Sequence, residues 1–146
     1  MKARRDVIEG LSHMTFIVRD LDRMEEILTK VIDARKVYDS GSESFSTSRE
    51  RFFMVGDIWI AIMEGESLPA RSYNHIAFKI SEADYSTCLE QVRSLGLEIR
   101  EGRSRVESEG RSIYFYDEDN HLFELHTGTL GERLRRYAAG KPQAFT

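Results

Sequence analysis

Short β-branched and aromatic runs alternate with amphipathic stretches along this chain, and the same order occurs twice. Residues 10–18 read Gly-Leu-Ser-His-Met-Thr-Phe-Ile-Val, and residues 72–80 read Ser-Tyr-Asn-His-Ile-Ala-Phe-Lys-Ile. Each run places a His three residues before a Phe and a β-branched residue two positions later, and His75 follows His13 by 62 residues. Both runs are typical of strands. The pattern therefore indicates an internal repeat.

An amphipathic helix is predicted after each of these strands. In the first half Asp20 is a suitable N-cap, and the apolar stripe consists of Leu21, Met24, Ile27, Leu28, Val31 and Ile32. In the second half Ser81 and Asp84 predict a capping box, and Gly96 suits the position just beyond the helix. The stripe there consists of Tyr85, Cys88, Leu89, Val92 and Leu95. Because Cys88 lies on this stripe, we expect it to be a small core residue and not a nucleophile.

Three strand candidates follow each helix, and turn residues separate the last two of each set. The candidates are 35–38, 49–55 and 58–63 in the first half and 97–100, 111–116 and 121–126 in the second, with turns at 56–57 and 117–120. A further amphipathic helix is predicted over 129–139. We therefore expect an α+β fold of paired βαβββ modules with a short C-terminal helix, in one domain spanning 1–146. Module 1 would span about 7–66 and module 2 about 72–128.

Composition excludes several classes of function. The 146 residues carry a net charge of −4, which argues against a nucleic-acid partner. The single cysteine forbids an intrachain disulfide, and no stretch approaches the roughly 18 apolar residues of a membrane span. Two arginines near the N-terminus have no apolar stretch behind them, so we expect no secretory signal and a cytoplasmic protein. Sixteen Arg against five Lys hint at an oxyanion ligand, although genome composition would explain this bias equally well.

Strand alternation places potential metal ligands on the faces opposite the apolar residues. His13 shares a face with Thr15, His75 lies opposite Phe78, and Glu124 lies opposite Phe123. Aligning the turns at Gly56 and Asn120 places Ile60 where the second half has Glu124, so the repeat supplies two histidines and one carboxylate. Two His and one carboxylate form a common open metal set.

Simpler roles exist for the same residue types. A lone strand His is usually structural, and a lone strand Glu usually faces solvent. His126 shares a face with Glu124 and is a rival ligand, whereas His121 opens a hairpin strand and is expected at the surface. The duplicated His favours the metal site over these alternatives.

At these residues the chain resembles the vicinal oxygen chelate superfamily, and within it the fosfomycin-resistance proteins, most closely the FosX-type epoxide hydrolases. The resemblance covers nearly the whole chain except residues 1–6 and the last few. It rests on five segments in order: 10–16, 45–53 (Phe-Ser-Thr-Ser-Arg-Glu-Arg-Phe-Phe), 72–78, 109–117 (Glu-Gly-Arg-Ser-Ile-Tyr-Phe-Tyr-Asp) and 121–130 (His-Leu-Phe-Glu-Leu-His-Thr-Gly-Thr-Leu).

The resemblance implies a site that spacing alone does not provide. It implies His13, His75 and Glu124 as ligands of one divalent metal, typically Mn²⁺. It also implies a homodimer in which His13 comes from one subunit and the other two ligands come from its partner. The implied substrate is fosfomycin, a small epoxide bearing a phosphonate, bound at family positions that here hold Thr15, Tyr73, Arg103, Ser108, Ser112, Tyr114 and Arg133.

The resemblance also places Glu50 where the hydrolase branch keeps its general base. Addition of water needs such a base, because neutral water is a poor nucleophile. Glu50 shares a face with Phe52 and Met54, which favours a pocket, and Glu43 is a reserve candidate. Two flanking arginines would favour the charged carboxylate and weaken it as a base, a conflict that the sequence leaves open.

Three other functions fit parts of the pattern. A glutathione or bacillithiol transferase on the same scaffold would not need Glu50. A non-haem iron oxygenase can use the same two-His-one-carboxylate set, although a site lined by Arg and Ser argues against it. A non-catalytic drug-binding module would need no metal ligands at all.

Overall fold

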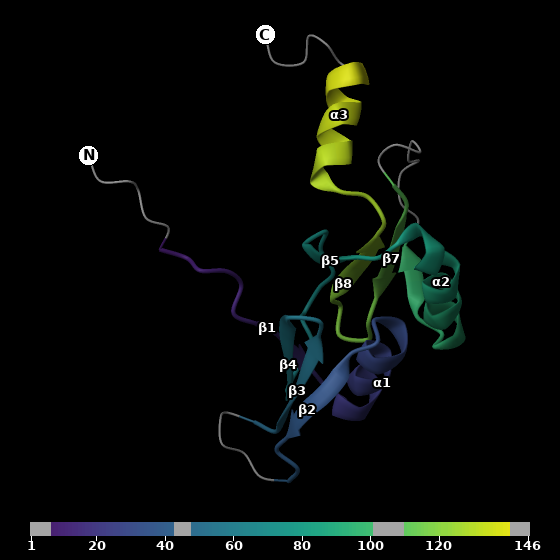
Figure 1. The fold of residues 1–146 in the computed structure, drawn as a ribbon. Coiled ribbons are helices and arrows are strands. Elements are labelled where there is room, and N and C mark those ends of the chain that lie inside the picture. The colour runs from purple at the N-terminus through teal and green to yellow at the C-terminus, as the bar shows by residue number, and fades with distance from the viewer. Residues whose placement is uncertain (1–6, 43–47, 101–109, 141–146) are drawn as a thin grey trace, which may run out of the picture. The chain divides into compact units, whose positions relative to one another are not determined.

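The structure is a computed structural model that describes residues 7–42, 48–100 and 110–140 (Figure 1). The chain divides into two compact units, Met1–Ser67 and Leu68–Thr146. Each unit contains one four-stranded sheet, and the two sheets share the same strand order and directions. None of the described helices is long and apolar enough to cross a membrane. These features confirm the α+β fold of paired βαβββ modules.

The first unit consists of β1 (Met14–Val18), α1 (Leu21–Val31), β2 (Arg35–Asp39), β3 (Glu50–Val55) and β4 (Ile58–Glu64). Its sheet has the order β1-β4-β3-β2, with β1 parallel to β4 and the other pairs antiparallel. The second unit consists of β5 (His75–Lys79), the 3₁₀ turn η1 (Glu82–Asp84), α2 (Tyr85–Ser94), β6 (Glu98–Arg100), β7 (Ser112–Tyr116), β8 (Leu122–His126) and α3 (Leu130–Gly140). Its sheet has the equivalent order β5-β8-β7-β6.

Helix α1 forms as its pattern predicts. The Asp20 carboxylate accepts a hydrogen bond from the backbone N–H of Arg23 at 3.1 Å, which satisfies one free donor of the first turn. The apolar stripe of α1 is buried in the core of the first unit. The same core contains Ile60 and Ile62, two fully buried residues of β4. One face of the first sheet is therefore committed to the core, and the opposite face is left for other side chains.

Helix α2 begins differently from the prediction. The Ser81 hydroxyl donates to the Asp84 carboxylate at 2.9 Å instead of capping a backbone N–H, and η1 leads into the helix. The predicted capping box is therefore wrong, because Asp84 is one methylene shorter than the Glu that normally reaches back. Gly96 does follow the helix with a φ of +68°, as predicted.

The sheet registers correct one equivalence between the two halves. Thr15 pairs with Ala61 in the first unit, and Ala77 pairs with Glu124 in the second. With His13 equivalent to His75, Ala61 and not Ile60 occupies the position of Glu124. The error arose because Gly56 and Asn120 both have positive φ but lie at different places in turns of unequal length.

The turn between β7 and β8 is built on a buried carboxylate. Asp117 accepts hydrogen bonds from the backbone N–H groups of Asp119 and His121 at 2.9 and 2.8 Å, and its second oxygen lies 2.7 Å from Nδ1 of His121. His121 is therefore largely buried against Asp117, and the prediction of a surface position is wrong. Leu68 bonds to the same turn through Asp119 and Asn120, which fixes the start of the second unit.

Candidate functional site

The second unit contains a cavity of about 310 Å³ at the end of its sheet. It lies where β5 and β8 run side by side and the chain turns into α3. The cavity is lined by His75, Ala77, Glu124, His126, Gly128, Thr129, Leu130 and Arg133. Two histidines, a carboxylate and a guanidinium therefore line one small space.

His75 and Glu124 form a pair that is suited to a cation. Nδ1 of His75 lies 2.7 Å from the carbonyl oxygen of Tyr73, which can only accept, so this nitrogen carries a proton. In the neutral ring Nε2 then presents a lone pair, and it lies 3.1 Å from Oε1 of Glu124. Glu124 is only 4% exposed. Two acceptors held this close in a buried place are complementary to a divalent cation shared between them.

The rest of the Glu124 carboxylate is held by hydrogen bonds within the sheet. The Ser112 hydroxyl donates to Oε2 of Glu124 at 2.5 Å, and Nδ1 of His126 lies 2.7 Å from the Ser112 hydroxyl oxygen. Nε2 of His126 lies 3.4 Å from Nη2 of Arg133, a residue of α3. The structure thus brings together four of the residues singled out by sequence, His75, Ser112, Glu124 and Arg133, and joins three of them through His126.

Two tyrosines lie beside His75. The Tyr73 hydroxyl donates to the Tyr114 hydroxyl at 3.1 Å, and the rings of Tyr73 and Tyr114 lie 4.8 and 5.5 Å from the His75 ring. Tyr114 is buried and pairs with Glu124 across β7 and β8, whereas Tyr73 is largely exposed. Arg100 lies over the Tyr73 ring at 4.5 Å. Both tyrosines therefore belong to the surroundings of the His75–Glu124 pair.

In the first unit, His13 lies just before β1 and stacks on Trp59 with ring centroids 4.2 Å apart. Phe52 contacts the same indole edge-on, at 5.3 Å. His13, Thr15 and Trp59 thus lie on the sheet face opposite the buried Phe16 and Ile60, as strand alternation predicts for His13 and Thr15. Trp59 was not singled out by the sequence reasoning, although its position in an alternating strand could have pointed to this face.

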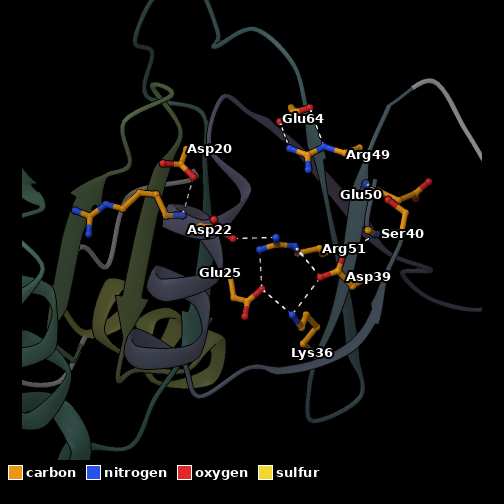
Figure 2. Close-up of polar contacts among 12 residues, drawn as sticks. Asp20, Asp22, Glu25, Lys36, Asp39, Ser40, Arg49, Glu50, Arg51 and Glu64 are labelled. Atoms are coloured by element: carbon orange, nitrogen blue, oxygen red, sulfur yellow. Dashed lines mark hydrogen bonds and ion pairs between the residues drawn. The ribbon is translucent and has the colours of Figure 1, made fainter. Parts of the chain in front are cut away.

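Glu50 begins β3 on that same face, together with Phe52 and Met54. Its backbone N–H is bound by the Ser40 hydroxyl at 3.0 Å, but within the described residues its carboxylate has no hydrogen-bond or ion-pair partner. Figure 2 shows this carboxylate pointing away from Arg51 and the groups that Arg51 contacts. An unpaired carboxylate on a partly buried sheet face is available to accept a proton.

The two arginines that flank Glu50 in the chain are bound to other carboxylates. Arg51 pairs with Asp22, Glu25 and Asp39 on the helix side of the sheet, at 2.8, 2.9 and 3.1 Å. Arg49 makes a two-point pair with Glu64 and holds the pKa of that carboxyl below its usual range by hydrogen bonding (Figure 2). Both cations are therefore directed at other carboxylates and not at Glu50.

Some predicted positions stay outside this account. Arg103, Ser108 and the reserve base Glu43 lie outside the described residues. Among the residues that the structure does describe, no three His, Cys, Asp or Glu side chains come together as a metal site. His75 and Glu124 are two of the three ligands expected from the resemblance.

Comparison with known proteins places this fold and site in a family. The model of the glyoxalase/bleomycin resistance protein/dioxygenase superfamily matches residues 10–125. The chain belongs to this superfamily. It is 68% identical over 134 residues to the fosfomycin resistance protein FosX of Mesorhizobium japonicum, a match that covers 92% of this chain and 96% of that protein. The superfamily membership confirms the expected resemblance.

Two further members of the superfamily show which of its branches this chain resembles more. A crystal structure of a Glu-to-Gln variant of FosX from Listeria monocytogenes, complexed with Mn(II) and 1S,2S-dihydroxypropylphosphonic acid, is 50% identical with a TM-score of 0.80. It covers 90% of this chain and 99% of that one. The metallothiol transferase FosB of Staphylococcus saprophyticus is 32% identical over 140 residues, covering 93% of this chain and 88% of that protein. The chain is therefore much more similar to the FosX proteins than to this thiol transferase.

Proposed function

We propose that this protein is a Mn²⁺-dependent epoxide hydrolase that adds water to fosfomycin and yields a diol phosphonate. One observation carries the proposal: a single cavity holds the His75–Glu124 pair, which suits a cation, beside the Arg133 guanidinium, which suits an anion. A substrate with a basic epoxide oxygen and a phosphonate needs both. The FosX structure with Mn(II) and a dihydroxypropylphosphonate supports the same substrate and product classes.

We assign His13, His75 and Glu124 as the metal ligands. When bound, the cation would act as a Lewis acid toward the epoxide oxygen. The chain itself prepares the ligands: Tyr73 fixes the His75 tautomer through its carbonyl, and Ser112 fixes one oxygen of Glu124. Such partners orient ligands and raise their basicity.

For the phosphonate we assign Arg133, Tyr114, Tyr73 and Thr15, with Arg103 and Ser108 as expected contributors from the sequence. A guanidinium is the best-matched donor for a phosphonate, because it can bind two oxygens at once. Ser112 was assigned to the same group, but its only proton is used by Glu124. We therefore infer that Ser112 acts on the substrate through that ligand.

Glu50 supplies the base in this proposal. The attacking water forms a bond to a ring carbon and gives its proton to the Glu50 carboxylate, while the carbon–oxygen bond of the epoxide breaks and the ring oxygen takes up a proton from solvent. The product gains the atoms of one water. The absence of a cationic partner on Glu50 among the described residues supports this role, because a paired carboxylate would be a weaker base.

We further propose that the protein works as a homodimer with metal sites shared between subunits, in the cytoplasm. Several large apolar side chains are exposed in the single chain, notably Val7, Ile8 and Leu11 near its start and Leu130 and Leu134 on α3, with 88, 76, 74, 72 and 55% of their surfaces accessible. Large apolar side chains exposed in each unit are suited to burial against a second chain. Light scattering should therefore give twice the 16.9 kDa of the single chain.

The test is phosphorus NMR of fosfomycin incubated with Mn²⁺-loaded protein without any thiol. The diol phosphonate is the expected product. A reaction that starts only when glutathione or bacillithiol is added would replace the hydrolase with a thiol transferase. Binding of fosfomycin without turnover under either condition would favour a drug-binding module, and oxygen uptake dependent on Fe²⁺ would favour an oxygenase.

A further inference from the structure

His126 lies between the two charged groups of the cavity and contacts both sides. Its Nδ1 is 2.7 Å from the Ser112 hydroxyl, which in turn is 2.5 Å from Oε2 of Glu124. Its Nε2 is 3.4 Å from Nη2 of Arg133. A continuous series of contacts therefore runs from α3 through His126 on β8 and Ser112 on β7 back to Glu124 on β8.

The chemistry of the partners fixes the direction of each hydrogen bond. Glu124 as a carboxylate can only accept, so the single proton of Ser112 points to it, and 2.5 Å is a normal length for a hydroxyl bound to a charged oxygen. Ser112 must then accept from His126, which places a proton on Nδ1. Arg133 can only donate, so Nε2 of His126 must accept. All of the hydrogen bonds run from Arg133 towards Glu124.

We propose that His126, through its contacts with Ser112 and Arg133, is a positioning residue that links the phosphonate-binding Arg133 to the metal ligand Glu124. This inference rests on the proposed function of the site. In this arrangement Nδ1 of His126 lies beside the Ser112 hydroxyl and, at 3.3 Å, beside Oε2 of Glu124, while Nε2 faces the cation of Arg133. His75 differs in that its Nδ1 is held by the backbone carbonyl of Tyr73, which leaves Nε2 beside Oε1 of Glu124.

The arrangement gives each ring nitrogen a separate task. Nδ1 holds the Ser112 hydroxyl in the orientation that binds Glu124, so its loss would loosen a metal ligand. Nε2 holds the Arg133 guanidinium over the cavity, so its loss would loosen the anion site. Partners that orient metal ligands are worth about 10- to 100-fold in metal affinity.

Two conservative variants separate these tasks. In His126→Asn the amide nitrogen can take the place of Nδ1 but nothing replaces Nε2. In His126→Gln the amide oxygen can take the place of Nε2 but nothing replaces Nδ1. We expect His126→Gln to weaken Mn²⁺ binding, followed by electron paramagnetic resonance without substrate, about tenfold. We expect His126→Asn to keep Mn²⁺ affinity within about twofold and to raise the KM for fosfomycin and the inhibition constant of methylphosphonate about tenfold, with a smaller change in kcat.

A histidine in the same hairpin provides the control. His121 binds Asp117 in the β7–β8 turn and does not line the cavity, so His121→Gln should lower the melting temperature without changing Mn²⁺ affinity. In a Ser112→Ala background the additional change His126→Gln should have a smaller effect on Mn²⁺ affinity than in the unaltered protein, because only the direct contact between His126 and Glu124 is then lost. Unchanged Mn²⁺ affinity in His126→Gln would overturn the proposal.

The tautomer can be read directly in the unaltered protein. Nitrogen-15 NMR of the metal-free protein should show His126 with a protonated Nδ1 and a bare Nε2, and the reverse assignment would overturn the proposal even if the variants fail to fold. Metal affinity and tautomer are measured without turnover. An enzyme that hydrolyses fosfomycin but has the wrong tautomer refutes only the role of His126, whereas the right tautomer without hydrolysis refutes only the proposed function.

Discussion

Arg49 is bound to Glu64, at 3.1 Å from Nε to Oε1 and 2.5 Å from Nη2 to Oε2, although its neighbour in the chain is the carboxylate of Glu50. Both side chains of this pair are about 40% exposed, so the pair contributes little to stability. By binding Arg49, Glu64 holds this guanidinium away from the neighbouring Glu50 carboxylate. The pair therefore matters more for the proposed base than for the fold.

Replacing Glu64 by Gln tests this relationship. The freed Arg49 can turn towards Glu50, and a cation there stabilises the charged carboxylate and weakens it as a base. We expect a several-fold lower kcat at neutral pH with unchanged Mn²⁺ affinity, measured by phosphorus NMR and electron paramagnetic resonance. The double change Arg49→Gln with Glu64→Gln should recover the rate.

The second unit offers a matched control for that experiment. Arg71 and Glu98 form a similarly exposed two-point pair, at 2.7 and 3.0 Å. Glu98→Gln removes the carboxylate partner of an arginine in the other unit, where Arg71 keeps its contact with the Tyr116 ring at 4.0 Å. An equal loss of kcat in both variants would show that the effect does not act through Glu50.

Glu50→Gln removes the proposed base and keeps its size. General base catalysis contributes about 10²- to 10⁴-fold, so hydrolysis should fall by at least about 100-fold while Mn²⁺ binding is retained. Glu66→Gln, an exposed position in the same unit, is the control and should have no effect. Turnover at the normal rate in Glu50→Gln would remove this residue from the mechanism.

Cys88 should be chemically inert at neutral pH. Burial, assisted by the charge of Asp84, raises the pKa of its thiol above the ordinary value, so the reactive thiolate is scarce. Alkylation by iodoacetamide should be slow at pH 7 and accelerate only at alkaline pH, and Cys88→Ala should keep full hydrolysis. Since the thiol ionises more readily in the unfolded chain, its contribution to stability is complete at neutral pH and is lost as the pH rises through the raised pKa. Fast labelling at pH 7 would contradict this.

Replacing Gly110 by Ala should disturb the cavity, although Gly110 is not one of the residues that line it. Gly110 has a φ of +83°, and an added Cβ would lie 2.5 Å from the backbone nitrogen of Gly128, which lines the cavity. Gly96 has a φ of +68° with open space around it, so Gly96→Ala carries the backbone strain without the collision. We expect Gly96→Ala to cost about 1 kcal/mol in unfolding free energy and to leave the KM unchanged.

For Gly110→Ala we expect a larger loss, of about 2–3 kcal/mol, together with a higher KM for fosfomycin. Chemical denaturation and steady-state kinetics measure the two effects. If Gly110→Ala and Gly96→Ala have the same unfolding free energy and the same KM, the backbone around Gly128 can move to admit the added Cβ without affecting the site.

The faces of the strands could be predicted because alternation is a property of the local chain. Phe16 and Phe78 are buried and His13 and His75 lie on the opposite faces, as the alternation indicated. The register between the halves could not be predicted, because it depends on turn length. Gly56 and Asn120 are both turn residues with positive φ, and the sequence alone suggested that they are equivalent. The structure shows that they are not equivalent.

The charge environment of Glu50 was equally beyond the sequence. Alternation places Arg51 on the face opposite Glu50, but the sequence does not show which carboxylates bind Arg49 and Arg51, because these come from α1, β2 and β4. Likewise, His126 was recognised only as a rival ligand. Its contact with Arg133 depends on how α3 follows β8, which no strand pattern encodes.

The sheet registers have a last consequence for how such an enzyme can change its chemistry. Glu50 pairs with Met63 as Ser112 pairs with His126, so the proposed base and the hydroxyl that holds the metal ligand occupy the same place in the two repeats. In the first repeat this position does not serve a proposed metal ligand, because the residue equivalent to Glu124 is Ala61. On the proposed assignments, a substitution at this position in the first repeat would change how the nucleophile is activated, whereas the same position in the second repeat supports the metal ligand.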